Sequence, residues 1–466
     1  MTTEQSAFHA AVLEHSADRV GAGAPPVDPV LLATSELHGS LEDGSLDSMN
    51  FLNEIALRFP DAVSFAPGRP YEGFFDTGLV HDYLRRFERY LREEKGFDEA
   101  QVRRTLLQYG RTKGIVHELI ARHLELDEGV TADPESIVVT VGCQEAMFLT
   151  LRALRADERD VLLAVSPAYV GITGAARLVD MPVLEVPAGP RGVDLEALAR
   201  VARTAREQGL RPRACYLVPD FSNPLGTSLD LATRRELLKV AEREDLLLLE
   251  DNPYGYFSAD GERLPTLKSL DTGRRVVYLG SFAKTGLPGA RIGYVVADQP
   301  VADREGRVGL LADQLSKIKS MLTVNTSPLA QAVIGGKLLA HGCDLRSANE
   351  RETEVYAGNL RRLLEGLARH FPPGCGSGVT WNVPRGGFFL VVNVPFAADE
   401  ALLEVSARDH GVLWTPMRFF GRGDGADRQI RLSYSLVTPA QIDVGLERFA
   451  ALVARRVGEG VACAAP

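Results

Sequence analysis

The sequence has few cysteines, and no two of them stand at the spacing that a zinc site or a small disulfide framework requires. Its five cysteines lie far apart in a chain of 466 residues, which favours free thiols in a reducing compartment. Runs of about 18 apolar residues, the length that spans a membrane, are also missing. The first 20 residues lack the basic start and apolar centre of a signal peptide. We therefore expect no metal site, no membrane span and a cytoplasmic location.

Basic residues are in the minority, with 52 Lys and Arg against 62 Asp and Glu and a formal net charge of −10. A surface that binds nucleic acid is normally basic, so this balance argues against DNA, RNA or an anionic membrane as a partner. The remaining composition, with 45% hydrophobic residues, is that of a globular chain long enough for two or three domains.

The middle of the chain contains seven short apolar runs separated by helical stretches such as 229–244. The runs are 136–141, 161–166, 182–187, 214–219, 246–250, 275–280 and 292–297. They are nearly continuous in apolar character, as strands buried on both faces must be. This alternation predicts an α/β fold with a doubly wound, seven-stranded, mainly parallel sheet, and such sheets bind ligands at the carboxyl ends of their strands.

The flanking regions have a different pattern. Residues 65–75 (FAPGRPYEGFF) predict a loop, and a polar helix is expected at about 78–95. Helices are predicted from about 310 to 370, with a break near 325–328. Two segments, 381–395 and 428–435, are expected to be strands of a second, smaller α+β domain.

The residues that follow the apolar runs suit a ligand that carries an anion. Gly142, Cys143 and Gln144 begin a helix, where free N–H groups and the helix dipole favour a phosphate. Ser281 adds a hydroxyl donor, and Arg291 adds a guanidinium that can bind phosphate through two N–H groups.

The same strand ends also suit a flat ring with a protonatable nitrogen and a carbonyl group. Tyr169 offers an aromatic face for stacking, and Asn223 and Tyr254 can donate hydrogen bonds to a phenolate oxygen. Asp251 ends a buried run and is costly there without a cationic partner, which a protonated pyridine would supply. Lys284 is an amine that can condense with an aldehyde.

Taken together, these motifs resemble the class I/II aminotransferases of pyridoxal-phosphate (PLP) fold type I, and most of all the branch that contains kynurenine and 2-aminoadipate aminotransferases. Eight motifs occur in the family's order between about residues 45 and 455. They are LQYG (107–110), TVGCQEA (140–146), PAY (167–169), PDFSNPLG (219–226), EDNPYGYF (250–257), GSFAKTGLPGARIGY (280–294), PRGGFFL (384–390) and IRLSYS (430–435). Each motif is weak alone, but eight in register are specific.

The resemblance implies an aspartate-aminotransferase-like fold and roles for individual residues. Lys284 would form the Schiff base with PLP and then move a proton between the substrate and the cofactor. Asp251 would keep the pyridine nitrogen protonated, and Asn223 and Tyr254 would bind the ring oxygen. Tyr169 would stack on the ring.

The resemblance also implies how the phosphate and the substrate are held. The phosphate would be bound by Gly142, Cys143, Gln144, Ser281 and Arg291. Tyr109 would reach it from the partner subunit of a homodimer with shared active sites. Arg431 would hold the α-carboxylate of the amino acid or 2-oxo acid substrate.

The family pattern further suggests a division into domains. Residues 1–45 would be an extension, 46–100 a segment with the substrate lid, 101–330 the large PLP-binding domain, 331–456 the small domain and 457–466 a tail. Two arginines depart from the pattern. Arg69 in the lid and Arg418 in WTPMRFF (414–420) are hypothesised to bind a second acidic group of the substrate, although both could be exposed loop residues.

Less specific interpretations exist for several of these residues. Asp251 could cap a helix, Asn223 could begin a turn, and Arg431 could form a surface ion pair. The Ser281–Lys284 spacing also imitates a penicillin-binding motif, but that site needs two lysines on separate elements.

Two classes of protein other than transaminases share parts of this pattern. The same cofactor site could serve β- or γ-elimination or replacement, or carbon–carbon bond formation, in a specialised biosynthetic pathway, because all begin with the same proton abstraction. A transcription regulator with an aminotransferase-like domain would need a longer, basic N-terminal segment than the 45 residues present here. The sequence therefore favours a transaminase that works by a ping-pong Schiff-base mechanism.

Overall fold

The structure is a computed structural model that describes residues 30–42, 51, 54–189, 191–421 and 425–463, with the side chains of 459–463 left out. The chain divides into two units, Met1–Gly44 and Ser45–Pro466. The described part of the first unit forms two short 3-10 helices, η1 (Thr34–Glu36) and η2 (Gly39–Glu42). Most of the predicted N-terminal extension lies outside the described residues.

The second unit is built around a seven-stranded sheet with the strand order β2-β8-β7-β6-β5-β3-β4. Its strands are β2 (Ile137–Val141), β3 (Asp160–Ser166), β4 (Val183–Pro187), β5 (Arg211–Leu217), β6 (Leu247–Asp251), β7 (Val276–Ser281) and β8 (Ile292–Val296). β8 runs antiparallel to both of its neighbours, and all the other neighbouring pairs are parallel. The predicted seven-stranded, mainly parallel sheet is therefore confirmed, each strand within a few residues of its apolar run.

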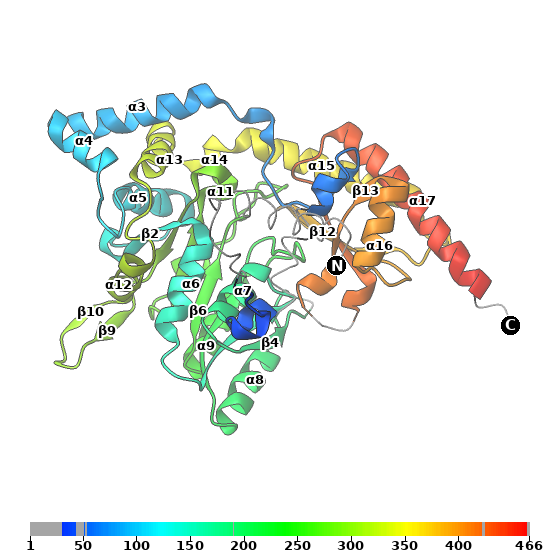
Figure 1. The fold of residues 1–466 in the computed structure, drawn as a ribbon, viewed down its shortest axis with the longest axis horizontal. Helices are drawn as coiled ribbons and strands as arrows, with labels where there is room; N and C mark the ends of the chain where they lie inside the picture. The colour runs from blue at the N-terminus through cyan, green and yellow to red at the C-terminus, as the bar shows by residue number, and fades with distance from the viewer. Residues whose placement is uncertain (1–29, 43–50, 52–53, 190, 422–424, 464–466) are drawn as a thin grey trace, which may run out of the picture. The chain divides into compact units, whose positions relative to one another are not determined.

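Helices cover both faces of this sheet (Figure 1). One face packs against α6 (Gly142–Leu154), α7 (Val170–Leu178) and α12 (Leu311–Leu322), and the other against α8 (Leu195–Glu207) and α9 (Leu231–Arg243). Apolar side chains such as Leu162 and Leu163 alternate between the two faces, so the central strands are buried on both sides, whereas the edge strand β4 is partly exposed. A hairpin of β9 (Pro300–Ala302) and β10 (Val308–Leu310) extends beyond the sheet (Figure 1).

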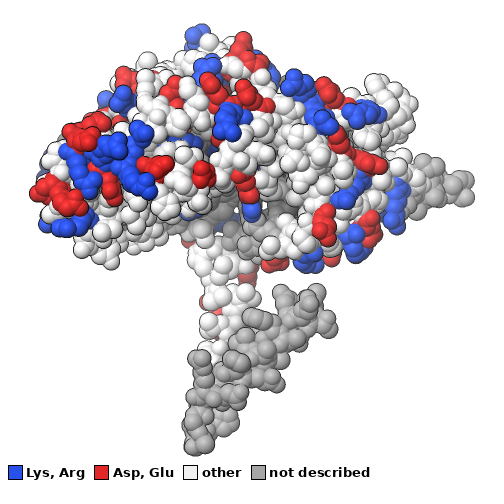
Figure 2. Space-filling model, turned by 90° about the horizontal axis from the view of Figure 1, so that it is seen from above, with Lys and Arg blue, Asp and Glu red and all other residues white. Residues whose placement is uncertain are grey.

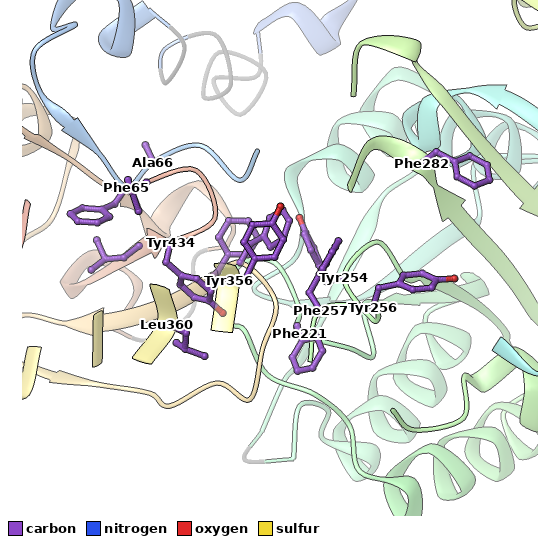
Figure 3. Close-up of a cluster of buried hydrophobic side chains, with 14 of the residues drawn as sticks. Phe65, Ala66, Phe221, Tyr254, Tyr256, Phe257, Phe282, Tyr356, Leu360 and Tyr434 are labelled. Carbon is purple, nitrogen blue, oxygen red and sulfur yellow. The ribbon is translucent and has the colours of Figure 1, made fainter. Parts of the chain in front are cut away.

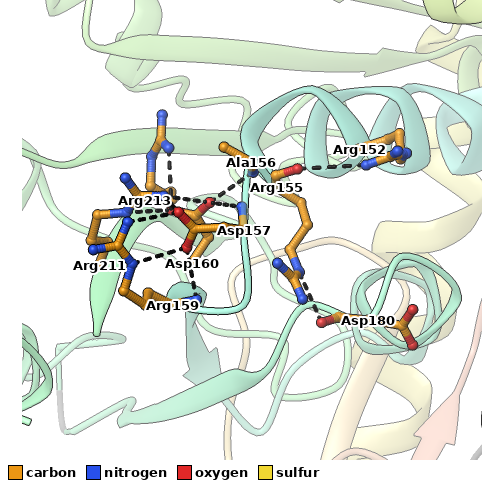
Figure 4. Close-up of polar contacts among 9 residues, drawn as sticks. All are labelled: Arg152, Arg155, Ala156, Asp157, Arg159, Asp160, Asp180, Arg211 and Arg213. Carbon is orange, nitrogen blue, oxygen red and sulfur yellow. Dashed lines mark hydrogen bonds and ion pairs between the residues drawn. The ribbon is translucent and has the colours of Figure 1, made fainter. Parts of the chain in front are cut away.

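Ion pairs stabilise the edge of the sheet where the parallel strands begin. Asp160 opens β3 with its carboxylate almost fully buried, and it accepts hydrogen bonds from Arg211 at 3.0 Å and Arg213 at 3.2 Å, both on β5 (Figure 4). Arg211 also pairs with Asp157 at 2.8 Å. The carboxyl ends of the parallel strands all lie at the opposite end of the sheet. The ion pairs therefore occupy the end where the strands begin, and the end where they finish is left for a ligand.

A second, smaller sheet is formed by the C-terminal part of the chain, with the order β11-β12-β15-β14. Its strands are β11 (Thr380–Trp381), β12 (Phe389–Asn393), β14 (Thr415–Pro416) and β15 (Gln429–Ser433). Near it, β1 (Val63–Ser64) pairs in parallel with β13 (Val412–Leu413), so residues that begin this unit lie against its C-terminal part. The predicted α+β character is confirmed, although the predicted strand 381–395 is interrupted between β11 and β12.

The remaining helices connect or flank these sheets. They are α3 (Thr77–Glu93), α4 (Glu99–Leu107), α5 (His117–Glu128), α10 (Leu267–Leu270), α11 (Phe282–Thr285), α13 (Pro328–Ala340), α14 (Leu345–Ala348), α15 (Glu350–His370), α16 (Glu400–Val405) and α17 (Pro439–Cys463). α3 packs closely on α13, where a Cβ at Gly336 would lie 1.9 Å from the carbonyl oxygen of Tyr83. The helix predicted at 78–95, the helices between 310 and 370 and their break at 325–328 are confirmed.

Aromatic side chains fill the space between the large sheet and the smaller one (Figure 3). The ring of Tyr254 lies 5.2 Å from that of Phe388, and the ring of Phe257 lies 5.1 Å from that of Tyr356 on α15. These buried contacts fix the loop after β6 against the C-terminal part of the chain, and this loop carries the predicted site residue Tyr254.

The surface has no simple charge pattern on the face shown in Figure 2, where basic and acidic side chains are interspersed. Among the helices in the described part of the chain, none is both long and apolar enough to cross a membrane. The described residues also contain no group of three or more His, Cys, Asp or Glu arranged to hold a metal ion.

Candidate active site

The predicted site residues meet at the carboxyl ends of the parallel strands. Gly142 follows β2, Tyr169 follows β3, Asn223 follows β5 and Lys284 follows β7, while Asp251 is the last residue of β6. These five positions are far apart in sequence, and the sheet brings them together because its parallel strands end at one edge.

Lys284 lies on α11, a single turn that directly follows β7. Ser281 begins this turn by accepting a hydrogen bond from the N–H of Ala283 at 3.2 Å. The Nζ of Lys284 donates to the carbonyl oxygen of Gly68 at 2.7 Å. Loss of water around the ammonium, reinforced by the positive charges of Arg431 and Arg291, lowers the pKa of Lys284 to about 8. The amine is therefore partly neutral near pH 7.5, which is the form that attacks an aldehyde.

Asp251 is 4% exposed, and its hydrogen-bond partners among the described residues are uncharged. Its Oδ2 accepts a hydrogen bond from the hydroxyl of Tyr216 at 2.6 Å, and its Oδ1 accepts one from the thiol of Cys143 at 3.6 Å. Burial raises the pKa of Asp251 to about 6, against the opposing effects of these two hydrogen bonds and of the charge on Lys284. A cationic ring nitrogen would supply the missing charge.

A cradle for an anion lies at the start of α6. Gly142 has a φ of +70°, and a Cβ at this position would lie 2.3 Å from an Nη of Arg291. Arg291 itself adopts the left-handed conformation, with a φ of +53°, and this brings its guanidinium over the backbone of Gly142. Only glycine leaves room for that contact, which combines a helix N-terminus with a delocalised positive charge.

Arg431 lies on β15 and is 5% exposed. Its guanidinium donates to Oδ1 of Asn223 at 2.6 Å, to the carbonyl oxygen of Ala66 at 2.7 Å and to the hydroxyl of Thr415 at 3.2 Å. All three acceptors are neutral, the Nε of Arg431 is buried without a hydrogen bond, and burial lowers the pKa of Arg431 to about 10. A buried guanidinium without a carboxylate partner among the described residues is suited to bind a carboxylate ligand.

Two aromatic rings cover Arg431. The Cζ of Arg431 lies 4.2 Å from the ring centre of Phe389 and 4.8 Å from that of Phe420. Phe420 belongs to a buried apolar group with Met417 and Val391, and its carbonyl oxygen accepts a hydrogen bond from the N–H of Ala168 at 2.9 Å. The loop after β14 is thereby held against the turn after β3, next to Tyr169.

The two tyrosines of the site differ in burial. Tyr254 is 4% exposed, and burial raises its pKa above the ordinary value. Tyr169 is partly buried, and loss of water, reinforced by the negative charge of Asp251, raises its pKa to about 12. Both side chains are therefore protonated near neutral pH and able to donate a hydrogen bond.

Three of the predicted site residues lie away from the other site residues or at the margin of the site. Arg418 forms an ion pair with Glu400 on α16, and both side chains are partly exposed. Arg69 is an exposed residue of the loop that follows β1, but its positive charge contributes to the lowered pKa of Lys284. Tyr109 is 79% exposed. Its role in a partner subunit remains a prediction.

Sequence reasoning missed several residues of the site. Tyr216 lies inside the apolar run of β5, where a tyrosine is an ordinary core residue and gives no signal of its bond to Asp251. The carbonyl groups of Ala66 and Gly68 were also missed, because a backbone acceptor leaves no pattern in the sequence. The aromatic pair Phe389 and Phe420 could have been suspected only from its place in the motifs that contain it.

Comparison with known proteins identifies the family. Residues 80–449 match the family described as "Aminotransferase class I and II". The chain is 57% identical over 426 residues to the (S)-3,5-dihydroxyphenylglycine transaminase of Amycolatopsis orientalis, covering 91% of this chain and 95% of that protein. It is 30% identical to the 2-aminoadipate transaminase of Thermus thermophilus, covering 84% of this chain and 89% of that protein.

Solved structures agree with this result. The α-aminoadipate aminotransferase of Thermus thermophilus, in complex with N-(5'-phosphopyridoxyl)-L-leucine, superposes with a TM-score of 0.72 at 28% identity and covers 92% of this chain and 100% of that chain. The kynurenine aminotransferase of Pyrococcus horikoshii superposes with a TM-score of 0.72 at 26% identity and covers 88% of this chain and 94% of that chain.

These relatives favour transamination over elimination, replacement or carbon–carbon bond formation. The buried lysine, the unpaired carboxylate and the anion cradle fit PLP, and the solved aminotransferase of Thermus thermophilus holds a phosphopyridoxyl adduct of leucine. The fold is that of aspartate aminotransferase, because the aspartate aminotransferase of Thermus thermophilus superposes with a TM-score of 0.70 at 23% identity and covers 89% of this chain and 99% of that chain. The chain belongs to the class I and II aminotransferases and is a PLP-dependent enzyme that moves an amino group between an amino acid and a 2-oxo acid.

Proposed function

We propose that the amino acid substrate is an arylglycine with phenolic hydroxyl groups, of which (S)-3,5-dihydroxyphenylglycine is the first candidate. The 57% identity over almost the whole length of both chains carries this proposal. The relatives that act on 2-aminoadipate or kynurenine are 30% identical or less. The corresponding 2-oxo acid is the arylglyoxylate.

The surroundings of Arg431 support an aromatic substrate. In an arylglycine the ring is attached directly to the α-carbon, so it must lie beside the group that binds the α-carboxylate. Phe389 and Phe420 lie on Arg431, and Phe420 continues into the apolar group with Met417 and Val391. Aromatic and apolar side chains of this kind favour a flat ring by burial and by ring contacts.

Each site residue has a proposed task in this reaction. When bound, PLP supplies an aldehyde that condenses with amines and a ring that withdraws electrons from the substrate α-carbon. Lys284 removes the α-proton at its Nζ and later returns a proton, since its lowered pKa gives both protonation states near neutral pH. Asp251, kept charged by Tyr216 and Cys143, holds a proton on the ring nitrogen. Tyr169 stacks on the ring, and Tyr254 donates to the ring oxygen.

The anion cradle and Arg431 would bind the two ends of the ligands. Backbone N–H groups of residues 142–144, Ser281 and the guanidinium of Arg291 are proposed to hold the cofactor phosphate. Arg431 binds the α-carboxylate. In doing so, its guanidinium exchanges a hydrogen bond to the neutral carbonyl oxygen of Ala66 for one to a charged carboxylate oxygen. Asn223, which already accepts from Arg431, keeps the guanidinium in the orientation that this contact requires.

A homodimer is part of the proposal, as is a cytoplasmic location. Exposed apolar side chains gather around the connection between α12 and α13 and the end of α4, where Gly110 approaches Asn325 and Pro328. They are Leu107, Tyr109, Met321, Leu322, Val324 and Leu329. A patch of this kind fits a subunit interface, and Tyr109 in it could reach the cofactor phosphate of a second copy.

The test is a comparison of amino donors with purified, PLP-loaded enzyme. (S)-3,5-dihydroxyphenylglycine, 4-hydroxyphenylglycine, 2-aminoadipate and kynurenine would each be mixed with a panel of 2-oxo acids, and oxo-acid release would be measured by liquid chromatography. We expect the highest kcat/KM for the hydroxylated arylglycines, with (S)-3,5-dihydroxyphenylglycine first. The Lys284→Ala variant should release no oxo acid from any donor. A higher kcat/KM for 2-aminoadipate or kynurenine would contradict the proposed substrate and leave the family assignment intact.

A further inference from the structure

A buried ion pair lies directly behind the anion cradle. Glu145, on the first turn of α6, accepts hydrogen bonds from the Nζ of Lys319 at 2.8 Å and from the hydroxyl of Thr323 at 2.6 Å. The side chain of Lys319 is 0% exposed and that of Glu145 is 6% exposed. Lys319 also donates to the hydroxyl of Thr323 at 2.9 Å, so the three side chains form a closed network.

The same carboxylate is bonded to the turn that forms the cradle. An oxygen of Glu145 accepts a hydrogen bond from the N–H of Val141 at 2.6 Å, and Val141 is the last residue of β2, directly before Gly142. The network therefore fixes the junction of β2 and α6 to the C-terminal end of α12. Thr326 adds a second attachment, because its hydroxyl donates to the carbonyl oxygen of Val139 on β2 at 2.9 Å.

The position of Glu145 poses an electrostatic problem for a phosphate ligand. A carboxylate at a helix N-terminus takes advantage of the same free N–H groups and the same dipole that a phosphate would use. Because Glu145 is itself buried, its negative charge would also repel a dianion, and water screens that repulsion less than it would at an exposed site. The ammonium of Lys319 cancels this charge at a distance of 2.8 Å.

We propose that Lys319 is a positioning residue for the cofactor: it neutralises Glu145 so that the start of α6 keeps its affinity for the phosphate of PLP. Glu145 in turn holds the turn at Val141 in the shape that directs the N–H groups of 142–144 toward the ligand. This inference rests on the proposed assignment of Gly142 and Arg291 to the phosphate. It assigns a task to an ion pair that does not itself belong to the cradle.

The experiment compares two cofactor forms that differ only in the phosphate. Apoenzyme would be titrated with PLP and with pyridoxal, and both dissociation constants would be read from the absorbance of the bound form. In Lys319→Met, Glu145 is left unpaired, and we expect the affinity for PLP to fall by about tenfold or more while that for pyridoxal changes little. Inorganic phosphate should also compete less well with PLP in this variant.

Three further variants separate charge from packing. Lys319→Met combined with Glu145→Gln should regain most of the affinity for PLP, and Lys319→Arg should keep it. Glu145→Gln alone, which leaves Lys319 charged, should strengthen PLP binding relative to pyridoxal. This last variant tests the idea even if Lys319→Met does not fold, and equal changes for both cofactor forms in these variants would overturn the proposal.

A control on Arg291 distinguishes failure of this inference from failure of the phosphate assignment. Arg291→Met should weaken PLP binding selectively over pyridoxal. If it does and the Lys319 variants do not, the role of Lys319 is wrong and the cradle stands. If Arg291→Met affects both forms equally, the cradle assignment itself is wrong.

Discussion

The lowered pKa of Lys284 leads to a prediction that needs no cofactor. An ordinary lysine with a pKa of 10.5 has about one amine in a thousand neutral at pH 7.5, whereas a pKa of about 8 leaves about a quarter neutral. In apoenzyme, Lys284 should therefore react with an amine reagent at neutral pH far faster than its unperturbed pKa would allow. Its reactivity should rise with pH with a midpoint at about pH 8, and it should level off about one pH unit above that midpoint.

Two substitutions should move this midpoint in opposite directions. The positive charge of Arg431 lowers the pKa of Lys284, so Arg431→Gln should raise it. The negative charge of Asp251 raises the pKa of Lys284, so Asp251→Asn should lower it and make the amine more reactive at pH 7. Opposite shifts of the Lys284 pKa in these two variants would exclude a general loosening of the site. Loosening would shift this pKa toward its ordinary value of 10.5 in both variants.

The measurement is competitive acetylation of apoenzyme by a trace of acetic anhydride across a pH series. Mass spectrometry of the peptide that contains Lys284 gives its labelling relative to a free reference amine, and the exposed Lys317 serves as an internal control whose profile should not differ between variants. A midpoint near the ordinary value in the unmodified protein would refute the reasoning, as would shifts of the same sign in Arg431→Gln and Asp251→Asn.

Three other predictions follow from the contacts of the site. Gly142→Ala should weaken PLP binding by about tenfold or more, measured by cofactor titration, because the left-handed backbone costs about 1 kcal/mol and the methyl group displaces Arg291. Arg431→Lys should lower kcat/KM for amino acids by about 100-fold in steady-state assays, since an ammonium cannot form the same two parallel hydrogen bonds. The charge of Asp251 is lost as the pH falls through its pKa of about 6. Tyr216→Phe removes a hydrogen bond that favours the charged form, so it should raise this pKa. The loss of PLP affinity at acidic pH should then occur at a higher pH than in the unmodified protein.

Much of the seven-stranded sheet could be predicted because most of its strands are buried on both faces. Such strands are short, apolar and separated by helices, and β2 through β8 all carried that pattern. The smaller sheet was harder, because its strands are shorter and interrupted. The stretch between β11 and β12 contains Pro384, Gly386 and Gly387, which interrupt a strand. Gly387 adopts a φ of +77°, and Gly386 forms an isolated bridge with Ser258.

The structure brings the predicted residues at strand ends together, but nothing in the sequence indicated the contacts that depend on distant partners. Arg418 lies in a loop that borders the site through Met417 and Phe420, but its own side chain turns outward to Glu400. Adjacent residues of one loop thus have different surroundings, and sequence alone does not tell which of them points inward. Glu145 and Lys319 are 174 positions apart, and nothing local marks them as a pair.

Among the described residues, some buried charged side chains form ion pairs and others do not. Glu145 with Lys319 and Asp220 with Arg234 each have their opposite charge inside the protein. Lys284, Asp251 and Arg431 do not: within the described residues their hydrogen-bond partners are carbonyl, hydroxyl, thiol and amide groups. A buried charge without an opposite charge is unfavourable in the ligand-free protein, so a fold that keeps three of them converging on one strand edge needs compensation from outside the chain. An aldehyde that condenses with the amine, a protonated ring nitrogen and an α-carboxylate provide it, and one cofactor with one amino acid carries all three.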